Sequence, residues 1–239
     1  MKDTLGTRMK ENYENCTRYY LPKRTNTIIR IDGKAFHSFT RNCEKPYDEH
    51  FMNAMNFTAE NLLKSIQGSV FAYVQSDEIS ILLQDYENEK TLAWLNGNIQ
   101  KIASISASIA TGYFNEYYRS DKIAFFDSRA FTICDNVEVY NYFLWRLNDC
   151  VRNSIQSLAH TLFSHKELLT LNQVQLINKC ADEHNIFFSD MPNAYKYGRI
   201  IKKQKYIKND IERTKYVTFS YVDALTVRHE FQTLCLIYK

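Results

Sequence analysis

The spacing of apolar residues along the first half of the chain predicts alternating helices and strands. Side chains that recur every three or four positions form one apolar helix face, and short β-branched or aromatic runs indicate strands. Helices are predicted over 3–20, 49–67 and 91–118. Strands are predicted over 26–32, 70–74, 79–83 and 124–134. From about residue 26 to residue 134 the order is therefore β-α-β-β-α-β.

This order is typical of the ferredoxin-like arrangement, an α+β fold with the helices on one face of the sheet. The first two strands run parallel, because a helix returns the chain between them. In the usual strand order the third strand lies between them. The carboxyl ends of the first two strands are therefore expected at the same edge of the sheet.

The second half predicts a helical and β-rich extension. Helical spacing continues at about 137–160 and 172–184, and the tail from Tyr195 is β-rich and basic. No repeat or clear linker separates the halves. We therefore expect a catalytic domain over 1–135, including the N-terminal helix, and an extension over 136–239 packed against it.

Composition narrows the class of protein. The chain has 239 residues, 45% of them hydrophobic, with only 6 Gly and 3 Pro, which favours a large folded core over disorder. A net charge of +3 excludes a histone-like polycation, so nucleic-acid binding must use local patches. The cysteines lack zinc-site spacing, and no apolar run reaches about 18 residues. We expect a cytoplasmic protein with reduced thiols and no membrane span.

Carboxylates follow the first two predicted strands. Asp32 ends the first strand, and Asp77 and Glu78 come directly after the second. Carboxylates that converge at one edge repel one another and raise one another's pKa, which a divalent cation relieves. Oxygen ligands without His or Cys favour Mg²⁺, and two such ions can activate a hydroxyl and stabilise a departing phosphate. These three residues are the candidate catalytic group.

The residues after Asp32 could hold a triphosphate. Gly33 would let the backbone approach a ligand closely, and the next four residues offer N–H groups, a cation and an aromatic ring: Lys34, Ala35, Phe36 and His37. Taken singly, Asp-Gly after a strand is an ordinary turn, Asp-Glu at a hairpin tip is ordinary surface polarity, and a lone His is more often structural. Their convergence at one edge favours function.

Four segments resemble one enzyme family. RIDGKAFHSF (30–39), KPYD (45–48), YVQSDEIS (73–80) and FDSR (126–129) are similar to motifs of the tRNA-His guanylyltransferases, especially the Thg1-like branch of 3′–5′ polymerases. Order and spacing match over about residues 6–155 and more weakly beyond. The resemblance implies a polymerase-type palm, two Mg²⁺ ions, activation of a tRNA 5′ end by ATP or GTP, nucleoside triphosphate substrates and a homotetramer.

The resemblance also implies residue roles. Asp32, Asp77 and the Gly33 carbonyl would bind the metals, and Glu78 would support them. The triphosphate would be held by the segment from Gly33 to His37 and by Ser76. Lys45 would contact the activating nucleotide, and Arg129 and Asn153 would be further phosphate contacts.

One segment departs from the His-tRNA-specific pattern. WRLNDCVRNSIQS (145–157) aligns with WRQADCHINNLYN, so Val151, Arg152 and Ser154 replace His, Ile and Asn. This favours template-directed repair of 5′-truncated tRNA over guanylate addition to tRNA-His. Arg152 is a candidate RNA contact.

A basic run follows in the tail. Residues 196–215 carry eight Lys or Arg and two acidic residues, with Tyr interleaved. Phosphate contacts are expected from Lys202, Lys203 and Lys205. A solvated edge strand protected by lysines would have the same sequence pattern.

Three other functions fit part of the pattern. A dedicated tRNA-His guanylyltransferase would use the same chemistry. A palm-type nucleotide cyclase would share the fold and metals, but Gln75-Ser76 stands where its Gly-Gly would precede the acidic pair. A non-catalytic RNA-binding module would gain nothing from clustered acids near phosphates.

Overall fold

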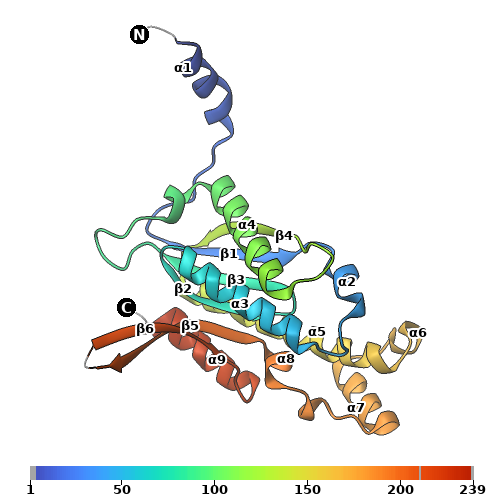
Figure 1. The fold of residues 1–239 in the computed structure, drawn as a ribbon. Helices are drawn as coiled ribbons and strands as arrows, with labels where there is room; N and C mark the ends of the chain where they lie inside the picture. The colour runs from blue at the N-terminus through green and yellow to red at the C-terminus, as the bar shows by residue number, and fades with distance from the viewer. Residues whose placement is uncertain (1–3, 210, 238–239) are drawn as a thin grey trace.

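A computed structural model describes residues 4–209 and 211–237. Its centre is a six-stranded antiparallel sheet with the order β4-β1-β3-β2-β5-β6 (Figure 1). The strands are β1 (Asn26–Gly33), β2 (Ser69–Gln75), β3 (Glu78–Gln84), β4 (Phe126–Ile133), β5 (Arg199–Lys208) and β6 (Ile211–Phe219). The longer helices are α3 (Glu49–Ser65), α4 (Ile99–Tyr118), α5 (Asn136–Leu162), α7 (Gln173–His184) and α9 (Ala224–Gln232). Short helices are α1 (Leu5–Met9), α2 (Phe36–Phe39), α6 (His165–Leu168) and α8 (Asn193–Tyr197).

The first four strands confirm the predicted β-α-β-β-α-β order. β3 is antiparallel to both β1 and β2, so β1 and β2 run parallel with β3 between them. Gly68, at a φ of 78°, leads from α3 into β2. Only Ser76 and Asp77 connect β2 to β3. The carboxyl ends of β1 and β2 therefore meet at one edge, as the sequence predicted.

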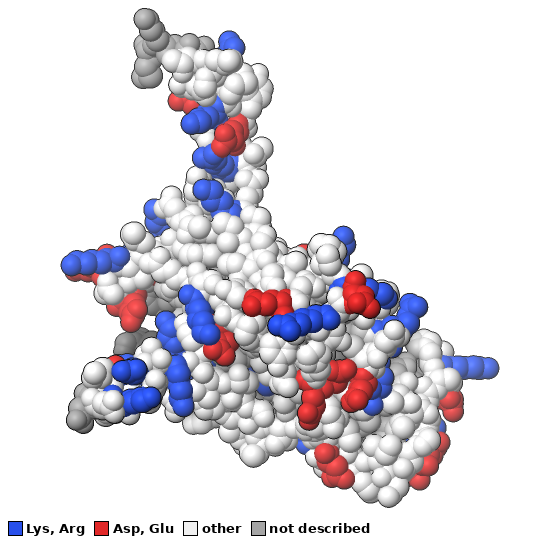
Figure 2. Space-filling view, in the orientation of Figure 1, with Lys and Arg blue, Asp and Glu red and all other residues white. Residues whose placement is uncertain are grey.

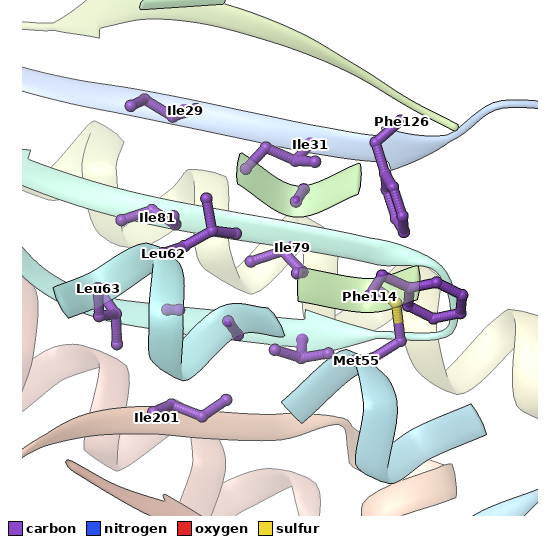
Figure 3. Close-up of a cluster of buried hydrophobic side chains, with 14 of the residues drawn as sticks. Ile29, Ile31, Met55, Leu62, Leu63, Ile79, Ile81, Phe114, Phe126 and Ile201 are labelled. Atoms are coloured by element: carbon purple, nitrogen blue, oxygen red, sulfur yellow. The ribbon is translucent and has the colours of Figure 1, made fainter. Parts of the chain in front are cut away.

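Alternate residues of each strand face two separate layers of helices. Ile29, Ile31 and Ile79 pack with α3 and α4 on one face, which is the core drawn in Figure 3. Ile28 and Phe71 pack on the other face with residues of α5 and α9. The helices of the first unit thus lie on one face as predicted, and helices of the C-terminal part cover the second.

The C-terminal part joins the sheet directly. β5 pairs with β2, and β6 pairs with β5 at the edge. The β-rich tail is confirmed, but the prediction missed α9, which begins where the Asp223 carboxylate accepts a hydrogen bond from the N–H of Thr226. A small third core forms where α5, α6 and α7 meet.

Two predicted helices have different bounds. The N-terminal helix is confirmed over Leu5–Thr17, through irregular turns, and stands away from the body of the molecule (Figure 1). It ends before Arg18, which is extended, and residue 3 lies outside the described part. The helix predicted from 91 begins only at Ile99, because Leu95 and Asn96 adopt left-handed φ angles and Asn98 caps the first turn.

Within residues 4–209 and 211–237, no helix has the length and apolar character needed to cross a membrane.

Candidate active site

The predicted carboxylates meet at the edge where β1 and β2 end. Asp32 is directly opposite Glu78 on β3 and opposite Asp127 on β4. The N–H of Gly33 donates to the carbonyl of Asp77 over 3.2 Å, which ties the end of β1 to the hairpin tip. Residues distant in sequence are therefore held together by backbone pairing.

The site lies on the face of the sheet that α5 covers. Asp32 has the same strand parity as Ile28, which packs in the core beneath α5 and α9. A cavity of about 530 Å³ opens there, and its lining includes Asp32, Asp77, Trp145 and Asn153. The middle of α5 thus forms the wall opposite the carboxylates.

Asp77 and Asp32 have raised pKa values. Burial, followed by the charge of Asp32, raises the pKa of Asp77 to about 6. Burial, with the nearby charges of Glu78 and Asp127, raises the pKa of Asp32, and Arg30 and Arg129 counteract part of this. Neither carboxylate forms an ion pair with a described residue. Both therefore favour the approach of an external cation.

The negative charge of the Glu78 carboxylate is already balanced by an ion pair with Arg146. Arg146 from α5 donates from Nε to Oε1 over 2.8 Å and from Nη2 to Oε2 over 2.7 Å. Ser80 and Gln75 also donate to Oε1, over 3.2 and 3.3 Å. With its oxygens occupied, Glu78 orients the hairpin beside Asp77 and is less available to a metal than the two aspartates.

Sequence reasoning missed Arg146 as the partner of Glu78. Arg146 is 6% exposed and also donates to Asp149 over 2.9 Å. The sequence did contain a clue to this pair. Arg146 lies on the apolar face of α5, one turn after Tyr142 and Phe143, and an arginine buried on such a face requires an acidic partner.

The donor set suits a hard cation. Within the described residues, no group of three or more His, Cys, Asp or Glu side chains is arranged to hold a metal. Two carboxylates alone leave most of a coordination shell to carbonyl oxygens, water and phosphate, which is the pattern of Mg²⁺ rather than of zinc. The site therefore fits the predicted ligands Asp32, Asp77 and the Gly33 carbonyl.

A second cavity of about 240 Å³ adjoins the first. Gln75, Ser76 and Asn153 line both. Lys45 lines only the second, where its Nζ donates to the carbonyl of Thr40 over 3.1 Å. Three predicted nucleotide contacts, Lys45, Ser76 and Asn153, thus all line the second cavity.

In the segment after Asp32, the ring of Phe36 belongs to the hydrophobic core. The Phe36 ring is buried, with Phe126, Phe39 and Phe114 at centroid distances of 5.0, 5.1 and 5.6 Å. A Cβ on Gly33 would lie 2.3 Å from that ring. Packing of Phe36 therefore requires the glycine, and the ring is not available to stack on a ligand.

The rest of this segment offers backbone groups and two exposed side chains. The N–H of Lys34 donates a hydrogen bond to the carbonyl of Phe125 over 2.8 Å. Ala35 has a left-handed φ of 56°, and α2 begins after it. Lys34 and His37 are exposed, and the His37 Nε2 lies 3.0 Å from the Ser38 hydroxyl.

The remaining predicted contacts, Arg129 on β4 and Arg152 on α5, have different surroundings. Arg129 lies beside Asp127, with 3.4 Å between Nη2 and Oδ1. Arg129 is not among the described residues that line either cavity. Arg152 pairs with Asp149 at the rim of the larger cavity. Arg152 therefore lines the larger cavity, whereas Arg129 acts on Asp32 through its charge.

The basic run forms the β5–β6 hairpin, and Lys and Arg side chains gather there on the face shown in Figure 2. The three predicted lysines do not share one face. Lys202 follows the parity of Ile200 and pairs with Glu230 of α9. Lys203 and Lys205 point to the opposite face, where Lys203 lies over the Tyr216 ring and Lys205 pairs with Glu212. Lys202 is thus a structural contact more than a free cation.

Known proteins resemble this chain over most of its length. A bacterial tRNA(His) guanylyltransferase (Thg1)-like protein solved with ATP has a TM-score of 0.89 and 38% identity, covering 98% of this chain and 100% of that one. The corresponding complex with GTP has a TM-score of 0.84. The Saccharomyces cerevisiae tRNA(His) guanylyltransferase, at 23% identity and a TM-score of 0.71 over 89% of this chain and 96% of that one, shares the fold.

Sequence relatives lead to the same family. An uncharacterized protein of Acanthamoeba polyphaga mimivirus is 31% identical, covering 92% of this chain and 84% of its own length. A probable tRNA(His) guanylyltransferase of Mus musculus is 27% identical, and the match covers 74% of this chain and 64% of that protein. The tRNAHis guanylyltransferase model matches residues 6–134, which include the whole carboxylate edge. The chain belongs to the tRNA-His guanylyltransferase family and is a nucleotidyltransferase.

Proposed function

We propose that this enzyme adds nucleotides in the 3′–5′ direction to the 5′ end of tRNA, using a polymerase-type palm and two Mg²⁺ ions. The observation that carries the proposal is the pair Asp32 and Asp77, which lie at one edge with raised pKa values and no ion pair to a described residue. A second cavity with three phosphate-binding candidates adjoins them. Metal ligands beside a triphosphate pocket are what phosphoryl chemistry at a nucleic-acid end requires.

Each part of the site has a proposed task. Asp32, Asp77 and the Gly33 carbonyl hold the metals, which when bound lower the pKa of an attacking hydroxyl and neutralise charge on the phosphates. Lys45, Ser76 and Asn153 hold the triphosphate that activates a 5′-monophosphorylated RNA end. Arg146 fixes Glu78 and keeps the hairpin tip, with Asp77, in place.

We further propose that ATP and GTP both serve as activating nucleotides, that the enzyme works in the cytoplasm, and that it is a homotetramer. The nucleotides are supported by the ATP and GTP complexes of the bacterial relative.

The preferred reaction is template-directed repair of 5′-truncated tRNA, because Val151 and Arg152 replace the His-specific pattern on α5. Base pairing then selects the nucleotide. A tRNA lacking its first nucleotide, with A, C, G or U opposite the gap, is expected to receive U, G, C or A. Primer-extension sequencing of the 5′ ends measures this.

The comparison substrate is full-length tRNA-His with an unpaired opposing base. If addition of G to that RNA exceeds repair by tenfold or more in kcat/KM, about 1.4 kcal/mol in barrier, the enzyme is a dedicated tRNA-His guanylyltransferase instead.

The β5–β6 hairpin is proposed to bind RNA phosphates through the face that carries Lys203 and Lys205. Replacing both with Gln should weaken tRNA binding. The slope of log K against log salt concentration should become shallower by about 0.7–0.9 for each phosphate that is no longer neutralised. Affinity for ATP should not change. Filter binding at several salt concentrations measures the slope.

Lys202→Gln is the matched control from the same strand. Because the Lys202 side chain is 27% exposed and paired with Glu230, whereas that of Lys205 is 72% exposed, replacement of Lys202 should change the slope less. Equal slopes for wild type and the double variant would mean that the hairpin is only a solvated edge.

A further inference from the structure

Arg199, the first residue of β5, has a buried guanidinium with an unused donor. The residue is 3% exposed. Its Nε donates to Asn56 Oδ1 over 2.8 Å and its Nη1 to the carbonyl of Ala194 over 3.3 Å. Its Nη2 has no hydrogen-bond partner among the described residues. Both acceptors are neutral, so the positive charge is left without a counter-charge.

Among the described residues, no acidic side chain supplies the counter-charge that Arg199 lacks. Burial lowers the pKa of Arg199 to about 10, and the neighbouring groups that act against this are the Cys150 thiol and the Tyr73 hydroxyl, which are uncharged at neutral pH. In a protein interior an unpaired cation is unfavourable unless an anion joins it. The structure therefore holds a donor and a charge that both lack a partner.

Arg199 lines the smaller cavity. In the pairing of β2 with β5 it is opposite Val74, the residue before Gln75 and Ser76, which line both cavities. Lys45 and Asn153 line the same hollow. Arg199 thus contributes to the wall of this cavity from the sheet, and Lys45 contributes from the loop before α3.

We propose that Arg199 binds a phosphate group of a nucleoside triphosphate in the smaller cavity. The charge decides the class of ligand group: a phosphate supplies both the acceptor that Nη2 lacks and the missing negative charge, whereas a base carbonyl would supply only the acceptor. The inference rests on the nucleotide-binding part of the proposed function. It adds a binding residue that the sequence motifs did not include.

Calorimetric titration of the full chain with Mg²⁺ and three ligands tests this assignment: ATP, GTP and inorganic tripolyphosphate. Arg199→Met should weaken all three by a similar factor, about tenfold or more, since the same charged interaction is removed from each. Arg199→Lys, which keeps the charge but not the forked geometry, should give intermediate losses. The melting temperature of ligand-free Arg199→Met should stay equal or rise, because an uncompensated buried charge has been removed.

Lys202→Met is the matched control, because it removes a cation of the same strand that already has a carboxylate partner. It should leave the three affinities unchanged. Unchanged affinities in Arg199→Met would overturn the proposal, as would a loss confined to ATP or to GTP, which would indicate base recognition. If Arg199→Met does not fold, the proposal stands or falls on Arg199→Lys: wild-type affinity for tripolyphosphate would overturn it. The titration uses no RNA, so a failure of 5′-end addition is measured separately.

Discussion

Asp77→Asn is expected to lower kcat/KM for nucleotide addition by about a thousandfold or more. The change removes one of only two carboxylates that face the larger cavity without an ion pair to a described residue, and loss of a metal ligand removes several kcal/mol of transition-state stabilisation. Single-turnover addition to a 5′-activated tRNA measures the chemical step directly. More than a tenth of wild-type activity in this variant would exclude Asp77 as a metal ligand.

The same variant should be more stable than the wild type when no metal is present. The pKa of Asp77 rises from 3.8 to about 6 on folding, so between these pH values the folded state binds more protons than the unfolded state. Stability of the metal-free wild type should therefore fall as pH rises through this window, by at most about 3 kcal/mol. Asn cannot ionise, so the advantage of the variant should be present at pH 7 and vanish near pH 4.

Asp127→Asn is the control for both measurements. Asp127 is also opposite Asp32, but its side chain is 59% exposed and lies beside Arg129. Its replacement should change stability little, since the side chain is exposed to solvent. Added Mg²⁺ should raise the melting temperature of the wild type and of Asp127→Asn, but not that of Asp77→Asn.

Arg146→Met should destabilise the fold by about 3–5 kcal/mol, the usual effect of removing one partner of a buried ion pair. The variant leaves the Glu78 carboxylate, 8% exposed, without the guanidinium that donates to both of its oxygens. Urea unfolding monitored by circular dichroism gives the change in free energy.

The double variant Arg146→Met, Glu78→Gln distinguishes the ion pair from packing. Removing the carboxylate charge should recover much of the stability, which a double-mutant cycle quantifies. If the double variant is as unstable as the sum of the two single variants, the arginine stabilises through its contacts with Trp145 and Asp149 rather than through Glu78.

The sequence was sufficient to predict the meeting of Asp32 with Asp77 because strand order fixes it. Apolar periodicity gave the elements, and the connection between β1 and β2 required both strands to end at one edge. The positions of individual side chains were less predictable. Phe36 stands three residues after Gly33 in a segment predicted to hold a triphosphate, yet its ring is buried in the core against that glycine.

Long-range pairs were beyond the reach of sequence reasoning. Nothing local distinguishes Lys202 from Lys203, because the pairing of Lys202 with Glu230 depends on a helix, α9, that the prediction lacked. Arg199 was counted as one basic residue of a charged run, although β2–β5 pairing and the Asn56 contact place it in the interior. Partners from distant segments decide whether a cation is exposed, paired or available.

Gln75, Ser76 and Asn153, two residues at a hairpin end and one on a helix, line both cavities. A ligand that displaces Asn153 in one cavity would also change the lining of the other, so we expect ligands in the two cavities to affect each other's binding.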